Sequence, residues 1–290
     1  MEILLDQLIN GLTRGAEYAL VAAGLALIFG VVRIVNFAHG EFYMVGAYAL
    51  FLTQSVLGLD YPLAALLMVV VMVPFGALFY GLVIHRVIGL AWQNQLVATL
   101  AASILLVNLA IVSAGSVPKF VYSPLVTEVA SLFDVTFAWQ RVLILGCAVA
   151  AFVGLYVLLK YTRPGKAMRA LSQNREACVV VGIPVHRIGL ITVMVGAGLA
   201  GVAAATIPVL SNVHPAMGLV VTVKAFAAVV MGGFGNVTGA IAAVFVIGIV
   251  EALGVGYVSS AYGDAFVFGI LILVLLVRPQ GVFGRAMRAS

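Results

Sequence analysis

Long apolar stretches separated by short polar segments form the dominant pattern of this 290-residue chain. A helix that crosses a bilayer needs about 20 mainly apolar residues. Charge-poor stretches of comparable size cover residues 18–32, 42–59, 61–84, 94–116, 142–159, 188–210, 217–233, 236–255 and 262–277. The first can extend toward the N-terminus, because residues 4–16 carry few charges. The pattern predicts an all-α polytopic membrane protein with about eight to nine transmembrane helices.

Basic residues gather at two places and predict which loops are cytoplasmic. Residues 160–187 contain six Lys or Arg residues and a single acid, Glu176, and three arginines follow residue 277. Because Lys and Arg accumulate in cytoplasmic loops, both segments are predicted to face the cytoplasm. Counting back along the chain then places residues 85–86 inside, and residues 117–140 and the acidic N-terminus outside.

The same sidedness limits the block 188–277. Both of its ends lie on one face, so it crosses the membrane an even number of times. Residues 217–233 are few for a crossing and include Lys224. Four crossings result if this segment spans, and two result if one pair of segments is re-entrant. The chain is therefore also expected to contain one or more broken or re-entrant segments.

Composition excludes several classes of protein. Hydrophobic residues make up 64% of the chain and charged residues 9%, with a mean hydropathy of +1.22. Soluble domains are about half apolar and a quarter charged, so a soluble enzyme, a disulfide scaffold and a disordered tail are excluded. The net charge of +5 fits cytoplasmic loops better than nucleic-acid binding. Without a linker or a second soluble region, residues 1–290 are predicted to form one membrane domain.

The segment Arg33–Glu41, with the sequence RIVNFAHGE, interrupts two apolar stretches with polar residues. Transporters use such broken helices at substrate sites, where irregular backbone lines a cavity. Asn36 can cap a helix that begins near Gly40, and Glu41 would then lie in its positive first turn. An ordinary cytoplasmic turn is the alternative, and residue chemistry alone does not choose between the two.

Two further segments contain glycine or proline residues that can interrupt or end a helix. Gly232, Gly233 and Gly235 fall within four residues between apolar stretches, where they can break a helix or allow close approach of backbones. Residues 161–184 contain a helix-capable run bounded by Pro164-Gly165 and by Gly182. A short amphipathic helix there can lie on the membrane or dock in a groove of a partner protein.

Charged side chains inside apolar stretches need an explanation. Glu251 must be paired, solvated or neutral, and Lys224 either snorkels or faces a cavity, where it would pair with a carboxylate or a substrate. Arg14 and Glu17 are expected at the membrane interface. No phosphate-binding loop, metal-ligand spacing or nucleophile elbow occurs in the sequence, so neither a catalytic site nor a metal site is predicted.

Taken together, the motifs resemble one family. The following segments occur in this order along almost the whole chain: Asn36–Gly40 (NFAHG), Arg163–Ala170 (RPGKAMRA), Glu176-Ala177, Gly182, Gly232–Gly235 (GGFG), Glu251–Leu253 (EAL) and Arg278–Gly281 (RPQG). This series resembles the permease subunit of branched-chain amino acid ABC importers. One departure is the uncharged segment 87–95, where members often carry a basic, Pro-containing stretch, and it leaves the substrate open.

The resemblance implies roles for particular residues. The element with Glu176, Ala177 and Gly182 matches a coupling helix that is seated on the ATPase subunit, within a cytoplasmic coupling loop at residues 160–187. Arg169 belongs to the same expected contact. The translocation path is expected to include Asn36, Phe37, His39, Gly40, Glu41, Gly232, Gly233 and Gly235.

The resemblance also implies an assembly. Its parts would be a second, related permease, two ATPase subunits that bind ATP and Mg²⁺, and a periplasmic binding protein. This chain itself would hold no cofactor and would lie in the bacterial inner membrane, in contact with lipid. The predicted function is inward movement of a branched-chain or related small amino acid by alternating access. Urea, short amides or aromatic acids are alternative cargoes, and a secondary transporter or channel without ATPases is the alternative of a different class.

Overall fold

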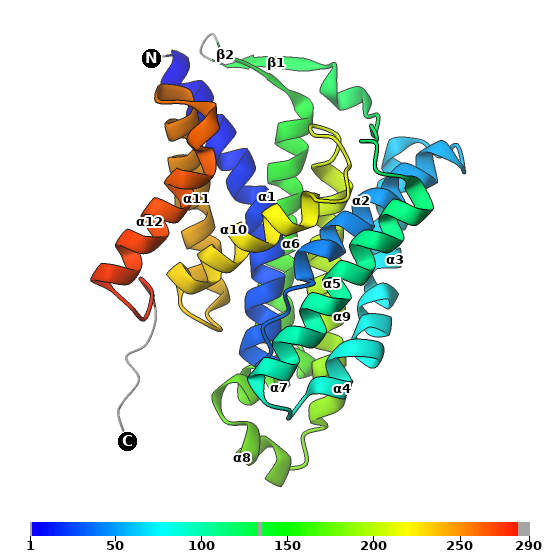
Figure 1. The fold of residues 1–290 in the computed structure, drawn as a ribbon, viewed down its shortest axis with the longest axis vertical. Coiled ribbons are helices and arrows are strands. Elements are labelled where there is room, and N and C mark those ends of the chain that lie inside the picture. The colour runs from blue at the N-terminus through cyan, green and yellow to red at the C-terminus, as the bar shows by residue number, and fades with distance from the viewer. Residues whose placement is uncertain (1, 133–134, 284–290) are drawn as a thin grey trace.

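A computed structural model of the chain describes residues 2–132 and 135–283. The fold is a bundle of helices with one small hairpin at its edge (Figure 1). The principal helices are α1 (Glu2–Val32), α2 (His39–Ser55), α3 (Tyr61–Phe79), α5 (Trp92–Ala114), α6 (Trp139–Tyr161), α9 (Val185–Thr206), α10 (Met217–Gly232), α11 (Val237–Tyr257) and α12 (Gly263–Val277). Shorter elements are a π-turn at Tyr80–Ile84, α4 (His85–Val87), α7 (Arg163–Gln173), α8 (Arg175–Val180), two 3-10 turns at Pro124–Val126 and Ser260–Tyr262, β1 (Val129–Leu132) and β2 (Val135–Ala138).

Seven helical segments in the described part of the chain are long and apolar enough to cross a membrane. Helices α2 and α10 are shorter, with 17 and 16 residues. At 1.5 Å per residue each is about 25 Å long, less than the roughly 30 Å hydrocarbon core. The predicted all-helical membrane fold is confirmed. The segment 217–233, for which a full crossing and a re-entrant segment were both open, forms the short helix α10. The stretch 42–59, predicted as a crossing, also forms only a short helix.

Helix α1 lies at the centre and packs against α6, α9, α10 and α11. Its contact with α11 depends on glycines, since a methyl group on Gly248 would lie 2.6 Å from the carbonyl oxygen of Gly11 and 2.8 Å from the Cα of Gly15. Small residues of this kind let helices approach closely where lipid supplies no hydrophobic driving force. This packing buries α1, whereas α5 and α12 lie at the periphery.

Different elements lie at the two ends of the bundle. The start of α1 and the hairpin lie at one end, and α4, α7 and α8 lie at the opposite end (Figure 1). This arrangement agrees with the predicted relative sidedness, in which residues 117–140 and the N-terminus are on one face and residues 160–187 are on the other.

The hairpin of β1 and β2 is not among the elements that the sequence predicts. Strands β1 and β2 pair antiparallel, with Val129 opposite Ala138. Val and Thr side chains favour such a pleated surface, but the segment is too short to be distinguished from a connector by pattern. A second pairing joins this outer loop to the segment after α9, because Lys119 and Val213 exchange backbone hydrogen bonds of 2.8 and 2.9 Å.

The charge distribution predicts that α7 faces the cytoplasm and β1 faces outside. In a variant without Cys147 and Cys178, cysteine at Ser172 on α7 is expected to react with a membrane-impermeant thiol reagent only from the cytoplasmic side. Cysteine at Ser131 on β1 is expected to react only from outside. Labelling of intact cells and of inverted vesicles measures both positions, and external labelling at position 172 would reverse the orientation.

Candidate functional site

The first candidate segment is a true interruption between two helices. Helix α1 ends at Val32, and Arg33 adopts a positive φ of 61°, which turns the chain back along the bundle. Residues 33–38 are not helical, and α2 begins at His39. In Figure 1 this connection rises from the far end of α1 to the middle of the bundle, where α2 starts. The segment is therefore more than a turn between two full-length helices.

Asn36 organises this connection, though not in the way that was expected. Its side-chain oxygen accepts a hydrogen bond of 3.1 Å from the Ala38 backbone N–H, two residues further on. The backbone oxygen of Asn36 accepts another, also of 3.1 Å, from His39. Asn36 thus forms an Asx turn just before α2, while the helix cap position itself is Ala38. The buried asparagine satisfies backbone donors at a depth where water is scarce.

His39 and Glu41 are buried, as a position away from lipid requires. One oxygen of the Glu41 carboxylate accepts a 3.0 Å hydrogen bond from Ser103 on α5. Its other oxygen lies against Gly218 in the first turn of α10, where the positive end of the helix dipole favours a carboxylate. Gly40 lies directly on the backbone of Gly218. The start of α2 is therefore seated on the start of α10.

The second candidate segment, residues 232–235, ends α10. Its glycines serve both predicted purposes, since some end the helix and one allows close approach of two backbones. Gly233 and Gly235 have φ values of 92° and 77°, which side chains rarely adopt. Gly232 instead allows close approach, because its Cα faces the backbone of Gly239 on α11. Asn236 then caps α11 by accepting a 3.0 Å hydrogen bond from the Gly239 N–H.

The two candidate segments do not form one compact site. Gly40 and Glu41 contact the beginning of α10, whereas Gly232–Gly235 lie at its end. A row of aromatic contacts connects them along α10: the ring centroids of Phe37 and Phe226 are 5.8 Å apart, and those of Phe226 and Phe234 are 6.1 Å apart. Helix α10 therefore links the two segments.

The third candidate segment folds as two short helices joined at a capping residue. Asn174 ends α7 and accepts a 2.9 Å hydrogen bond from Ala177 in the first turn of α8. Gly182 ends α8 with a φ of 79°, and the Gly182 and Ile183 N–H groups bond back to Val179 and Cys178 in a Schellman motif. Glycine is needed at position 182 for its positive φ and not for close packing, since no described atom lies within 4 Å of an added methyl group.

The residues expected to contact a partner are displayed on this loop. Arg169, Glu176 and Ala177 are exposed, and Val179, Val180 and Val181 are 60, 86 and 73% exposed. The opposite face is held to the bundle by Met168, Leu171 and Cys178, which are buried. Three neighbouring apolar side chains exposed in an otherwise polar loop mark an interaction surface.

The loop also reaches the glycine segment. A cavity of about 190 Å³ is lined by Arg169 and Ser172 from α7, Gly235 and Asn236 from the glycine turn, and the end of α1. Arg169 and Gly235, which were assigned separate roles from the sequence, thus face the same space.

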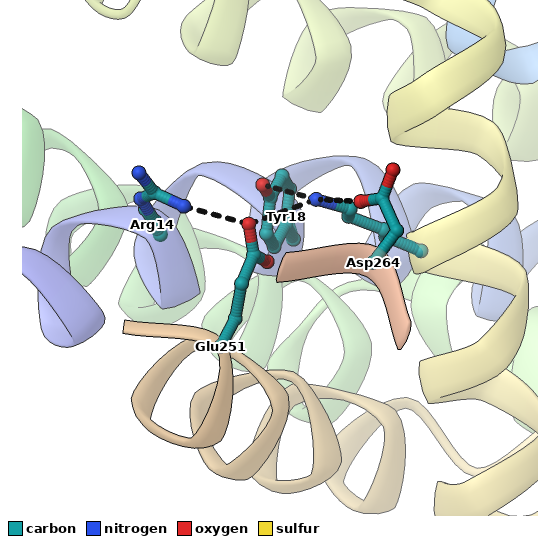
Figure 2. A network of polar contacts seen from close by, with 5 residues as sticks. Arg14, Tyr18, Glu251 and Asp264 are labelled. Atoms are coloured by element: carbon teal, nitrogen blue, oxygen red, sulfur yellow. Dashed lines mark hydrogen bonds and ion pairs between the residues drawn. The ribbon is translucent and has the colours of Figure 1, made fainter. Parts of the chain in front are cut away.

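A buried ionic network was only partly visible in the sequence. The Glu251 carboxylate lies between Arg14 at 2.7 Å and Lys224 at 2.9 Å. Figure 2 shows Arg14, Tyr18, Glu251 and Asp264 of this network. The Lys224 ammonium also pairs with Asp264 at 3.0 Å and donates to the Tyr18 hydroxyl at 3.2 Å. The sequence singles out Lys224 and Glu251 because they are charged residues in apolar stretches. Their contacts with Arg14 and Asp264 join four helices, and no feature of the sequence predicts these contacts.

Metal binding has no candidate site in the part of the chain that the structure describes, since no three His, Cys, Asp or Glu side chains are grouped to hold an ion. Interrupted helices inside an apolar helical bundle are typical of membrane transport proteins.

Comparisons with known proteins agree with this class. The fold is similar to the solved structure "PsaBC from Streptococcus pneumoniae in complex with Fab", with a TM-score of 0.51, 14% identity, and coverage of 93% of this chain and 91% of that chain. At this identity the likeness shows a shared fold alone.

The sequence comparisons identify the family. The chain belongs to the family described as branched-chain amino acid transport system / permease component, whose model matches residues 7–275. It is 35% identical to the permease protein BraD of Pseudomonas aeruginosa and 33% identical to LivH of Escherichia coli K12, covering 97% of this chain and 96% of each relative. A probable permease, LivH of Methanocaldococcus jannaschii, is 30% identical over 91% of this chain and 88% of its own length.

Family membership has direct consequences. The chain is the permease component of an ABC transport system, not a catalytic subunit, and a multi-pass membrane protein homologous to bacterial inner-membrane permeases. A component of this kind implies ATPase and binding-protein partners.

The contact between α2 and α10 predicts a selective sensitivity to a single methyl group. In Gly218→Ala the added methyl would lie 2.7 Å from the Glu41 carboxyl carbon and 2.9 Å from the Gly40 oxygen. Overpacking of this kind costs about 1–3 kcal/mol. The midpoint of thermal unfolding in detergent is expected to fall by a few degrees. Gly269→Ala on α12, where no atom lies within 4 Å, is the control, and equal midpoints for the two variants would contradict the close contact.

Proposed function

We propose that this chain forms one half of the membrane path of an ATP-driven importer that moves a branched-chain or related small amino acid into the cell by alternating access. The matches to BraD and LivH, both described as high-affinity branched-chain amino acid transport permeases, support this cargo. The structural observation that carries the proposal is the displayed α7–α8 loop, a surface that a transporter without ATPase subunits does not need.

The proposed path follows one side of α10. It includes Asn36, Phe37, His39, Gly40, Glu41, Gly232, Gly233 and Gly235. The aromatic row along α10 supports this choice, because Phe37 and Phe226 are only partly buried and Phe234 is 52% exposed. A second, related permease chain would cover this side and complete the path. Two halves that move relative to each other open the path to one face of the membrane at a time.

Coupling would run from α8 to α10. Two ATPase subunits, which bind ATP and Mg²⁺, would grip Arg169, Glu176, Ala177 and the neighbouring valines, with Gly182 setting the shape of the loop. Arg169 and Gly235 line one cavity, so α7 faces the turn that follows α10 across this space, and we expect a shift of α7 to alter that turn. The other end of α10 holds Glu41. An ATPase can drive the change only by binding the two states of this loop with different affinity.

Replacing Glu41 tests the assignment of the path. Glu41→Leu removes the carboxylate that joins Ser103 to the first turn of α10, so uptake of leucine is expected to fall at least tenfold while the ATPases still co-purify. Glu128→Leu changes an exposed carboxylate in the outer loop and should leave uptake unchanged. Normal uptake by Glu41→Leu would show that residues 33–41 form only a connecting turn and are not part of the path.

Replacing Gly182 tests the coupling and, through its wild-type arm, the function. A β-branched residue at positive φ costs about 1–2 kcal/mol or more, so Gly182→Val should distort the end of α8. Leucine uptake and leucine-stimulated ATP hydrolysis in vesicles, supplied with the ATPases and the binding protein, are expected to fall several-fold, and the ATPases should co-purify less.

Two control variants separate coupling from general strain. Gly58 also has a positive φ, of 64°, with nothing within 4 Å of an added methyl group, but it lies in the turn after α2. Gly58→Val should leave ATPase association unchanged, and Gly182→Asn should retain function because asparagine tolerates this backbone conformation. Wild-type uptake and ATP hydrolysis in Gly182→Val would refute the coupling role. Failure of the wild-type assembly to import leucine would refute the proposed cargo.

A further inference from the structure

A polar cavity at the end of the bundle opposite α7 and α8 borders the ionic network but lies apart from the three candidate segments. It measures about 400 Å³ and lies between α1, α6 and the segment that follows α9. Arg14 and Glu17 from α1 and Arg141 from α6 line one part of it. Another part is aliphatic, and it is lined by Ile144, Ile207 and Leu210.

The charges in this cavity are incompletely matched by the protein. The Arg141 Nη1 atom is buried without a hydrogen-bond partner in the part of the chain that the structure describes, and Asp6 approaches it only to 3.9 Å. Among the described residues, Glu17 forms no salt bridge. A buried guanidinium nitrogen that lacks a partner is costly, so this arrangement favours a ligand that brings a carboxylate.

Arg14 has a fixed position but spare donors. One of its nitrogens pairs with Glu251 at 2.7 Å, and Glu251 is itself held by Lys224 (Figure 2). A guanidinium carries five N–H donors, so this pair leaves other donors available to the cavity. The ionic network therefore presents a preorganised cation at the cavity wall.

The cavity continues toward the proposed path. Glu17, Tyr18 and Ser211 also line a neighbouring cavity of about 280 Å³, which extends to Tyr43 on α2 and Met217 at the start of α10. Met217 precedes Gly218, against which the Glu41 carboxylate lies. The second cavity therefore borders the start of the helix on which the Glu41 carboxylate is seated.

We infer that this cavity receives the zwitterion of an aliphatic α-amino acid on its way to the interrupted helix. The ligand carboxylate meets Arg14 and Arg141, its ammonium group meets Glu17, and its side chain lies against Ile144, Ile207 and Leu210. The inference rests on the proposed function, since it identifies where the cargo of that path is first held within this chain.

Protection of a cysteine in the cavity wall tests the inference. Ser211 is exposed and lines both cavities, so Ser211→Cys in a variant without Cys147 and Cys178 should react with a thiol reagent. The complete complex in proteoliposomes is used without binding protein, and modification of this chain is followed on a gel. Leucine is expected to slow the reaction, whereas 3-methylbutylamine and 4-methylpentanoate, which each lack one charge, should need at least tenfold higher concentrations.

Charge variants identify the partners of the ligand. Glu17→Gln and Arg141→Gln should each raise the leucine concentration for half-protection at least tenfold, because each removes a charge-assisted hydrogen bond. Glu128→Gln makes the same chemical change in the exposed outer loop and should have no effect. The analogue series leaves the charges of the cavity intact, so it decides the question even if a charge variant does not assemble.

The outcomes separate the inference from the proposed function. Leucine uptake by the wild-type complex with binding protein is measured in parallel. Uptake without protection of Ser211→Cys would overturn the cavity assignment alone. Equal protection by leucine and by either single-charge analogue would overturn it as well. Absence of uptake would instead contradict the proposed function.

Discussion

Leaving a backbone group or a charge without a partner inside a membrane is costly, and much of the structure of this chain reflects that constraint. Each departure from a continuous helix is covered by protein. Asn36 supplies the acceptor that the start of α2 needs, Asn236 does the same for α11, and Lys224 and Glu251 pair with each other inside the bundle. An interruption at depth is possible only where such a partner is at hand.

Close helix packing makes these partnerships possible. Gly11, Gly15 and Gly248 bring α1 and α11 together, and this contact places Arg14 of α1 beside Glu251 of α11. Gly40 and Gly218 similarly bring α2 onto α10. Glycine thus has a structural use here beyond turns. It removes the side chains that would otherwise hold the polar groups too far apart to pair.

Helix α10 is the element on which the functional parts meet. It is short, and both of its ends are buried: its start contacts the beginning of α2, and its end packs on the beginning of α11 and beside Gly30 of α1. Its first turn carries the Glu41 contact, its middle carries Lys224, and its end forms the glycine turn beside α7. A full-length helix would place its ends at the membrane surfaces, away from the other interrupted segments. This short helix therefore carries parts of all three contacts.

The sequence by itself determined the class, the helical architecture and the relative sidedness, because hydropathy and Lys/Arg bias are local properties that a membrane converts directly into topology. The order of its motifs along the chain indicated the family. The sequence also located the three candidate segments, since Asn36, the glycine cluster at 232–235 and Gly182 are of residue types that interrupt or end helices and that a continuous spanning helix does not need. Only the tertiary structure decided how those segments meet. Arg14, Lys224, Glu251 and Asp264 come from four helices, and Arg169 and Gly235 are 66 residues apart. Contacts between such residues depend on which faces of the helices pack together, and in a bundle where nearly every face is apolar the pattern of residues does not specify those faces.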